Sequence, residues 1–235
     1  MLGPADYTMW VLGFVLEVSV VVCSLYRRGL LRYFTLNLYM LAAAAITVGQ
    51  FVVIHRFGYS STEYFYFYYY SDTLLTILLY FCVIQLYQQV FEDMGVSNQI
   101  RGASLMLLSG TAWVSFMMVR QNQTHLTGRF VVELSQNLYF VGLILTYVLW
   151  GAVMKMRETR SRLIQFVLAL GVYFSAYSAT YALRNMFPHL ELTKILPPLV
   201  GTWLPLAWTY TFWKVPEEAR LAAASLVTTP STLTR

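Results

Sequence analysis

The stretch LRYFTLNLYMLAAAAITVGQFVVI, residues 31–54, is almost entirely apolar and long enough to cross a lipid bilayer. A helix needs about 20 mostly apolar residues to span the roughly 30 Å hydrocarbon core of a bilayer. The same pattern recurs along the chain, and the apolar stretches together take up almost the whole sequence. The sequence predicts seven spans, at about 7–26, 31–54, 64–91, 102–119, 130–154, 161–187 and 195–213.

The composition is that of a membrane protein made of helices. Hydrophobic residues make up 58% of the 235 residues and charged residues 11%, against about 25% charged residues in a typical soluble domain. Inside a bilayer every backbone polar group must be satisfied within the protein, so apolar runs of this length form helices. We therefore predict an all-α polytopic membrane protein, a seven-transmembrane-helix bundle that forms a single domain over residues 1–213.

The distribution of basic residues predicts the orientation of this bundle. Cytoplasmic loops of membrane proteins carry an excess of Lys and Arg. With the N-terminus outside, 11 of the 16 Lys and Arg residues fall on the inner side, including Arg27, Arg28 and Arg32 after the first span. We therefore expect the N-terminus outside and the C-terminus in the cytoplasm.

The residues after the last predicted span, 214–235, form a cytoplasmic tail in this topology. Pro216 followed by two glutamates is typical of the start of a helix, which predicts a short juxtamembrane helix at about 216–227. The tail and the basic loop Lys155–Arg162 are the expected contacts for a protein partner, with anionic lipid as the alternative. The net charge of +5 favours contact with membrane lipids and not with nucleic acid.

Ionisable residues inside the predicted spans are the candidate functional residues, because a charge in lipid is costly. Asp72 lies about two turns into the third span and Glu17 near the middle of the first span, so both are candidate proton sites. On the fifth span, helical spacing places Glu133, Gln136 and Asn137 on one face.

Two further polar residues lie at a similar depth on the sixth predicted span. Tyr181 and Arg184 share a face of that helix, and Arg184 is expected to pair with Asp72 or Glu133. The alternatives are a structural polar cluster that holds the helices together and a proton or ion relay. The sequence predicts a polar cavity open to the outer side and lined by Asp72, Glu133, Gln136, Asn137, Tyr181 and Arg184.

The sequence lacks the residues that membrane metalloenzymes and haem proteins require. The three histidines, His55, His125 and His189, fall in outer loops or at outer helix ends, and both cysteines lie inside spans. These positions suit neither a metal site, nor axial haem ligands, nor a disulfide framework. We therefore expect a non-enzymatic protein without a metal or cofactor.

The Tyr-rich segment Tyr64–Tyr70, the SDTLL that follows at 71–75 and the VIQLYQQVF at 83–91 resemble a group of uncharacterised bacterial seven-helix integral membrane proteins. The resemblance covers most of the chain and implies a location in the bacterial inner membrane, but no activity. The expected function is that of a receptor or sensor. The alternatives are a small solute or proton-coupled transporter and an accessory subunit of a larger membrane complex.

Overall fold

A computed structural model describes residues 4–27, 29–120, 126–156, 160–187 and 192–217. These residues form seven α-helices and one short 3₁₀ helix, η1, which follows α3. The elements are α1 (Pro4–Tyr26), α2 (Phe34–Phe57), α3 (Thr62–Val90), η1 (Glu92–Met94), α4 (Ser97–Arg120), α5 (Leu126–Lys155), α6 (Ser161–Met186) and α7 (Leu192–Lys214). The predicted all-helical fold is confirmed.

Five of the helices, α2 to α6, are long and apolar enough to cross a membrane. In α1 the described apolar part, Trp10–Tyr26, is shorter than these five. Each predicted span corresponds to one helix, and the ends differ by a few residues. The largest difference is at α4, which begins at Ser97 and not at 102, because Gly95 in the left-handed conformation ends η1 and polar residues then start the new helix.

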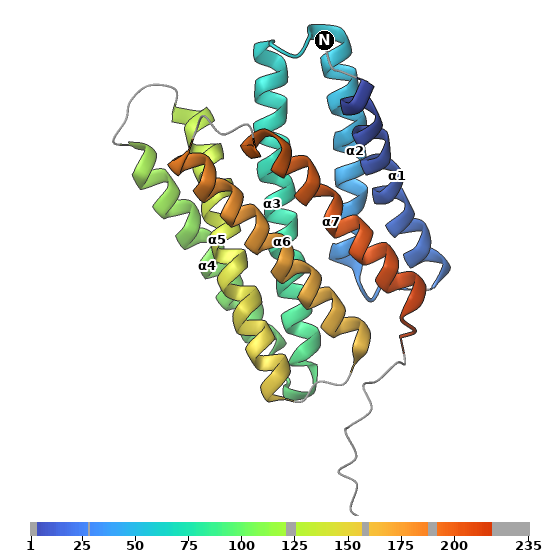
Figure 1. Cartoon of the computed structure of the whole chain (residues 1–235). Helices are drawn as coiled ribbons and strands as arrows, with labels where there is room; N and C mark the ends of the chain where they lie inside the picture. The colour runs from blue at the N-terminus through green and yellow to red at the C-terminus, as the bar shows by residue number, and fades with distance from the viewer. Residues whose placement is uncertain (1–3, 28, 121–125, 157–159, 188–191, 218–235) are drawn as a thin grey trace, which may run out of the picture.

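The helices form a ring of six, with α4 packed on its outside (Figure 1). Going around the ring, α1 contacts α2, α2 contacts α3, α3 contacts α5, α5 contacts α6, α6 contacts α7, and α7 returns to α1. Helix α4 packs against α5 and α3, and α3 also reaches α6 across the ring. Helix α3 is therefore the element that meets the most neighbours.

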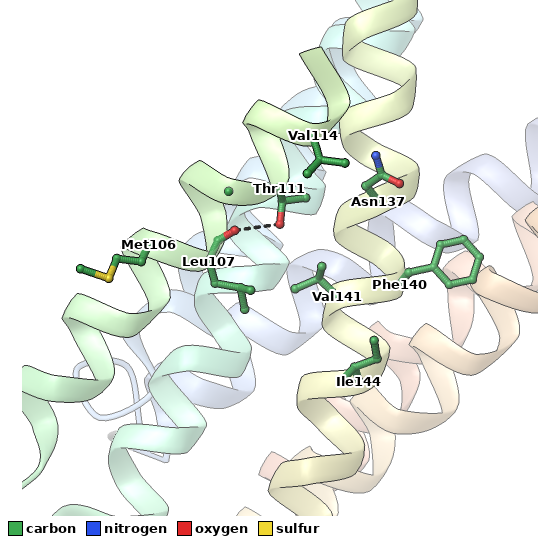
Figure 2. Close-up of a pocket in the computed structure, with 9 residues that line it drawn as sticks. Met106, Leu107, Thr111, Val114, Asn137, Phe140, Val141 and Ile144 are labelled. Atoms are coloured by element: carbon green, nitrogen blue, oxygen red, sulfur yellow. Dashed lines mark hydrogen bonds between the residues drawn. The ribbon is translucent and has the colours of Figure 1, made fainter. Parts of the chain in front are cut away.

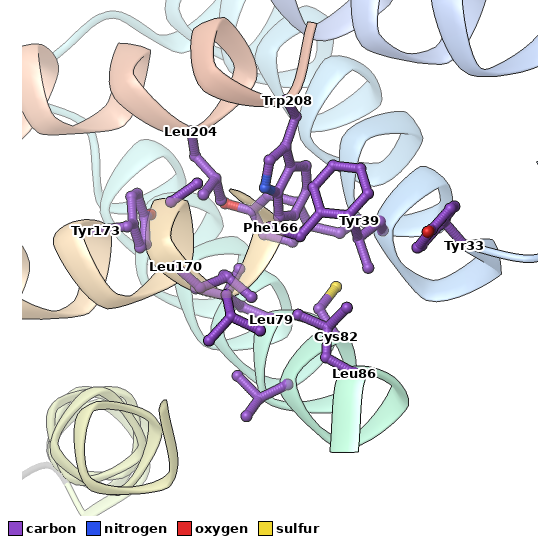
Figure 3. Packing of buried hydrophobic residues seen from close by; sticks show 14 of the residues in the cluster. Tyr33, Tyr39, Leu79, Cys82, Leu86, Phe166, Leu170, Tyr173, Leu204 and Trp208 are labelled. Atoms are coloured by element: carbon purple, nitrogen blue, oxygen red, sulfur yellow. The ribbon is translucent and has the colours of Figure 1, made fainter. Parts of the chain in front are cut away.

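An aromatic core fills the ring toward the end where α1 and α7 finish and α2 and α6 begin (Figure 3). Trp208 of α7 packs edge to face on Tyr39 of α2 and on Phe166 of α6, with ring centroids 5.9 and 6.2 Å apart. Phe212 lies one turn further along α7, with its centroid 5.0 Å from that of Phe166. Trp208, Phe166 and Phe212 are all fully buried. Buried aromatic side chains therefore fill the interior of the bundle at this end.

Candidate functional site

Asp72 lies on α3 where this helix packs against α5. The Ser135 hydroxyl of α5 donates a hydrogen bond to Asp72 Oδ2 at 2.6 Å, and it lies 3.2 Å from Thr76 Oγ1. One residue after Asp72, Thr73 donates to the Val131 carbonyl oxygen at 2.9 Å. These contacts form a polar seam between α3 and α5, with Asp72 as its one ionisable member.

A group of stacked tyrosines lies next to this seam, and we name Tyr139, Tyr173, Tyr177 and Tyr181 the tyrosine cluster. The rings of Tyr139 and Tyr177 are parallel, with centroids 4.8 Å apart, and Tyr181 lies 5.6 Å from Tyr139. Asp72 is close enough to Tyr139 and Tyr177 to interact electrostatically with both. The structure therefore brings two of the predicted residues, Asp72 and Tyr181, to the same part of the bundle.

Asn137 points in another direction. Its amide donates to the Ser115 hydroxyl of α4 at 2.9 Å, whereas Ser135, two residues earlier, faces Asp72 on α3. Glu133 and Gln136 are partly buried and make no side-chain hydrogen bond or ion pair with the rest of the described chain. The polar face predicted on α5 is thus divided between two neighbouring helices.

Asn137 also lines a groove between α4 and α5 (Figure 2). The groove has a volume of about 390 Å³ and is lined mainly by apolar residues, among them Leu107, Val114 and Phe140. Its second polar group, the Thr111 hydroxyl, donates to the Leu107 carbonyl oxygen. Because of this lining, the groove is not the polar cavity expected from the sequence.

The side chain of Arg184 lies outside the described part of the structure. The expected ion pair between Arg184 and Asp72 or Glu133 therefore stays a prediction.

The second predicted proton site, Glu17, lies in a different part of the ring, where α1 packs on α2. Thr47 of α2 donates to Glu17 Oε2 at 3.1 Å, so the carboxyl group joins α1 to α2. Tyr39 of α2 is buried and lies near both Glu17 and Tyr173 of the tyrosine cluster. Tyr39 thus lies next to Glu17 as well as to the tyrosine cluster.

A different polar site, which the sequence did not reveal, closes the end where α7 finishes. The Glu217 carboxylate accepts hydrogen bonds from Arg162, from Arg32 Nε at 3.1 Å and from the Tyr33 hydroxyl at 3.2 Å. Arg162 is buried, with 2% of its surface exposed, and also donates to the Val215 carbonyl oxygen at 2.6 and 2.9 Å. We name this arrangement the Glu217 site.

Tyr33 is a hydrogen-bond donor in the Glu217 site. Burial, together with the neighbouring Glu217 carboxylate, raises the pKa of the Tyr33 hydroxyl. The hydroxyl therefore keeps its proton at neutral pH and donates a hydrogen bond to the carboxylate.

Other arginines at the same end bind the carboxyl ends of helices. Arg27 donates to the Trp213 carbonyl oxygen at 3.0 Å, and Arg160 donates to the Gln89 carbonyl oxygen at 2.7 Å. Cations at helix C-termini satisfy free carbonyl groups and the helix dipole. Two residues of the loop predicted to bind a partner, Arg160 and Arg162, are thus engaged within the molecule.

The predicted juxtamembrane helix at 216–227 lies almost wholly outside the described residues. Pro216 and Glu217, the part that is described, are not helical. Instead the backbone turns so that Glu217 reaches the start of α6 and the connection before α2.

No family model, curated protein or solved structure matches this chain. Among the described residues, no group of three or more His, Cys, Asp or Glu side chains is placed to hold a metal ion. A functional interpretation therefore rests on the geometry of the sites themselves.

Proposed function

We propose that the chain spans the bacterial inner membrane seven times, with its N-terminus outside, and acts as a non-enzymatic receptor or sensor through Asp72. Support for seven spans comes from α1 and α7, which pack on each other and complete the ring that four of the five long apolar helices form. Support for the orientation comes from the inner-side arginines, since Arg27, Arg32, Arg160 and Arg162 gather at one end of the bundle.

The observation that carries the proposal is the placement of Asp72. It lies ten residues into α3, which corresponds to about 15 Å of helix at 1.5 Å per residue. A carboxyl group at this depth is costly in a membrane and marks a functional site by default. Ser135 and the tyrosine cluster supply polar groups around Asp72 that suit a small polar or cationic ligand.

The closed end of the bundle favours a receptor over an open channel. The buried aromatic side chains of Trp208, Phe166 and Phe212 fill the interior of the bundle on the inner side of the tyrosine cluster. In this proposal a ligand would reach Asp72 from the outer side, and its binding would be transmitted by movement of α3, α5 and α6. The signal would pass to a separate partner at the inner end.

The test is native mass spectrometry of the full chain, extracted gently from its host membrane, with Asp72→Asn as the variant. We expect a small molecule to accompany the native chain and to be lost from Asp72→Asn, because the substitution removes the ionisable carboxyl group but keeps the size of the side chain. Asn137→Ala is the matched control, since Asn137 binds Ser115 of α4 and not the polar seam.

Equal retention of the small molecule by the native chain and by Asp72→Asn would contradict the proposal. A stoichiometric protein partner without a small molecule would instead favour the accessory subunit.

A proton-coupled transporter is the second candidate, and the two carboxyl groups favour it. Asp72 is near Tyr139 of the tyrosine cluster, and Tyr39 is near both this cluster and Glu17, so polar side chains connect the two carboxyl groups. Polar side chains in series across a bundle are typical of proton relays. Proton uptake into proteoliposomes that is lost in both Asp72→Asn and Glu17→Gln would favour this candidate over the receptor.

A further inference from the structure

The Glu217 site has the donor set of a phosphate site. Two guanidinium groups and one phenol hydroxyl converge on the two oxygens of a single carboxylate. The planar fork of donors on Arg suits phosphate as well as carboxylate, and such charge-assisted hydrogen bonds are about twice as strong as neutral ones. The same donors therefore fit a phosphate oxygen wherever they fit Glu217.

The charge of the site favours an added anion. Arg32 and Arg162 bring two positive charges to the single negative charge of Glu217, so the site keeps a positive excess while Glu217 is bound. A phosphate group offers more acceptor oxygens than a carboxylate does. It would satisfy the guanidinium donors of both arginines at once.

One arginine of the site is held in place by contacts other than Glu217, and the other arginine is accessible from solvent. Arg162 is held independently of Glu217, by the Val215 carbonyl oxygen and against the ring of Phe212, 5.7 Å from its centroid. The Arg32 side chain, by contrast, is 47% exposed. An external anion can therefore reach Arg32 first and then the rigid Arg162 behind it.

The location of the site points to the source of this anion. It lies where α7 ends and α2 and α6 begin, in the layer that lipid headgroups occupy beside a bundle of this kind. Trp213 and Lys214, both exposed at this end of α7, are residues typical of the membrane interface. Phosphate is most concentrated in this layer as the headgroups of anionic lipids.

We propose that Arg32, Tyr33 and Arg162 bind the phosphate of an anionic lipid headgroup, and that Glu217 competes with the headgroup for this site. The proposal rests on the membrane placement proposed above but not on Asp72. Binding of a headgroup displaces the Glu217 side chain from both arginines, while the Val215 carbonyl oxygen stays bound to Arg162. The site thereby couples lipid composition at the inner surface to the position of Glu217.

The test measures lipid retention by the full chain in detergent after incubation with phosphatidylglycerol, counted by native mass spectrometry. In Glu217→Gln we expect phosphatidylglycerol retention to rise about fivefold, because the competing charge is gone. In Arg32→Ala, with Glu217 intact, we expect retention to fall below that of the native chain. Glu92→Gln is the matched control, since the Glu92 side chain is 68% exposed and its contact with Arg160 is 3.8 Å long.

Three results would overturn the proposal. The first is equal phosphatidylglycerol retention by the native chain, Glu217→Gln and Arg32→Ala, with melting temperatures that show all three folded. The second is an equal rise of zwitterionic phosphatidylcholine in Glu217→Gln. The third is a rise in melting temperature with inorganic phosphate alone, which would assign the site to a soluble phosphate and not to a lipid. Each result is independent of the small-molecule test on Asp72→Asn, which concerns the other half of the bundle.

Discussion

Gly142 on α5 faces Phe174 on α6, and the two helices approach closely at this point. A Cβ atom at position 142 would overlap the Phe174 ring, which is fully buried and has no room to move aside. We predict that Gly142→Ala lowers the free energy of unfolding by about 1–3 kcal/mol, the usual cost of overpacking. The measurement is the thermal midpoint of the full chain in detergent.

Gly110→Ala on α4 is the control for this prediction. A Cβ atom there would meet nothing within 4 Å, and alanine is a better helix former than glycine by about 0.5–1 kcal/mol. Its thermal midpoint should be unchanged or slightly raised. An equal drop of the thermal midpoint in Gly110→Ala and Gly142→Ala would contradict the close approach of α5 and α6 at Gly142.

An ionisable side chain within an apolar run identified candidate residues in the sequence. Helical spacing was a poorer guide to the partners of these residues. Asp72 stands out in the sequence because it is ionisable within an apolar run, and the structure places it in the α3–α5 seam. Its partner Ser135 has no such signal, since a serine is common in membrane helices and often bonds to its own backbone. A separation of two residues between Ser135 and Asn137 was enough to direct them to different helices.

Helix α4 packs on α3 and α5 through apolar side chains and a few polar contacts. The Tyr80 hydroxyl of α3 donates to the Ser104 carbonyl oxygen of α4 at 2.7 Å, and Tyr80 is 1% exposed. We predict that Tyr80→Phe lowers the free energy of unfolding by about 1 kcal/mol, the net value of one buried hydrogen bond. The thermal midpoint in detergent again reports the change.

Tyr147→Phe provides the comparison for α4. The Tyr147 side chain is 61% exposed on α5, and its hydroxyl lies 3.3 Å from Ser175 on α6, away from α4. Its midpoint should stay within error of the native value. A loss as large in Tyr147→Phe as in Tyr80→Phe would contradict a specific role of Tyr80 in holding α4.

For the molecule as a whole, the proposed topology places the α2–α3 connection outside and η1 inside. Tyr59 and Met94, one in each connection, are 62% and 60% exposed. In a chain whose buried Cys23 and Cys82 are replaced by alanine, we predict that a membrane-impermeant maleimide labels Tyr59→Cys on intact cells. Met94→Cys should be labelled only after the membrane is permeabilised.

The reverse labelling pattern would invert the topology and with it the proposed access to Asp72. It would also place the Glu217 site at the outer surface, because this site lies at the same end of the bundle as η1.

The sequence by itself determined the number of helices and their approximate ends. This was possible because a run of about 20 apolar residues has one stable form in lipid, a helix with its backbone hydrogen bonds satisfied internally. The ends moved only where local turns decided them, as Gly95 did before α4.

The tertiary structure alone decided which helices are neighbours and which polar groups meet. Lipid tails are as apolar as a protein core, so hydropathy does not tell a lipid-facing side from a buried one. For this reason the position of α4 outside the ring and the division of the α5 polar face could not be read from the sequence. The contact between Arg162 and Glu217 joins residues 55 positions apart, and it exists only because α6 and α7 pack side by side.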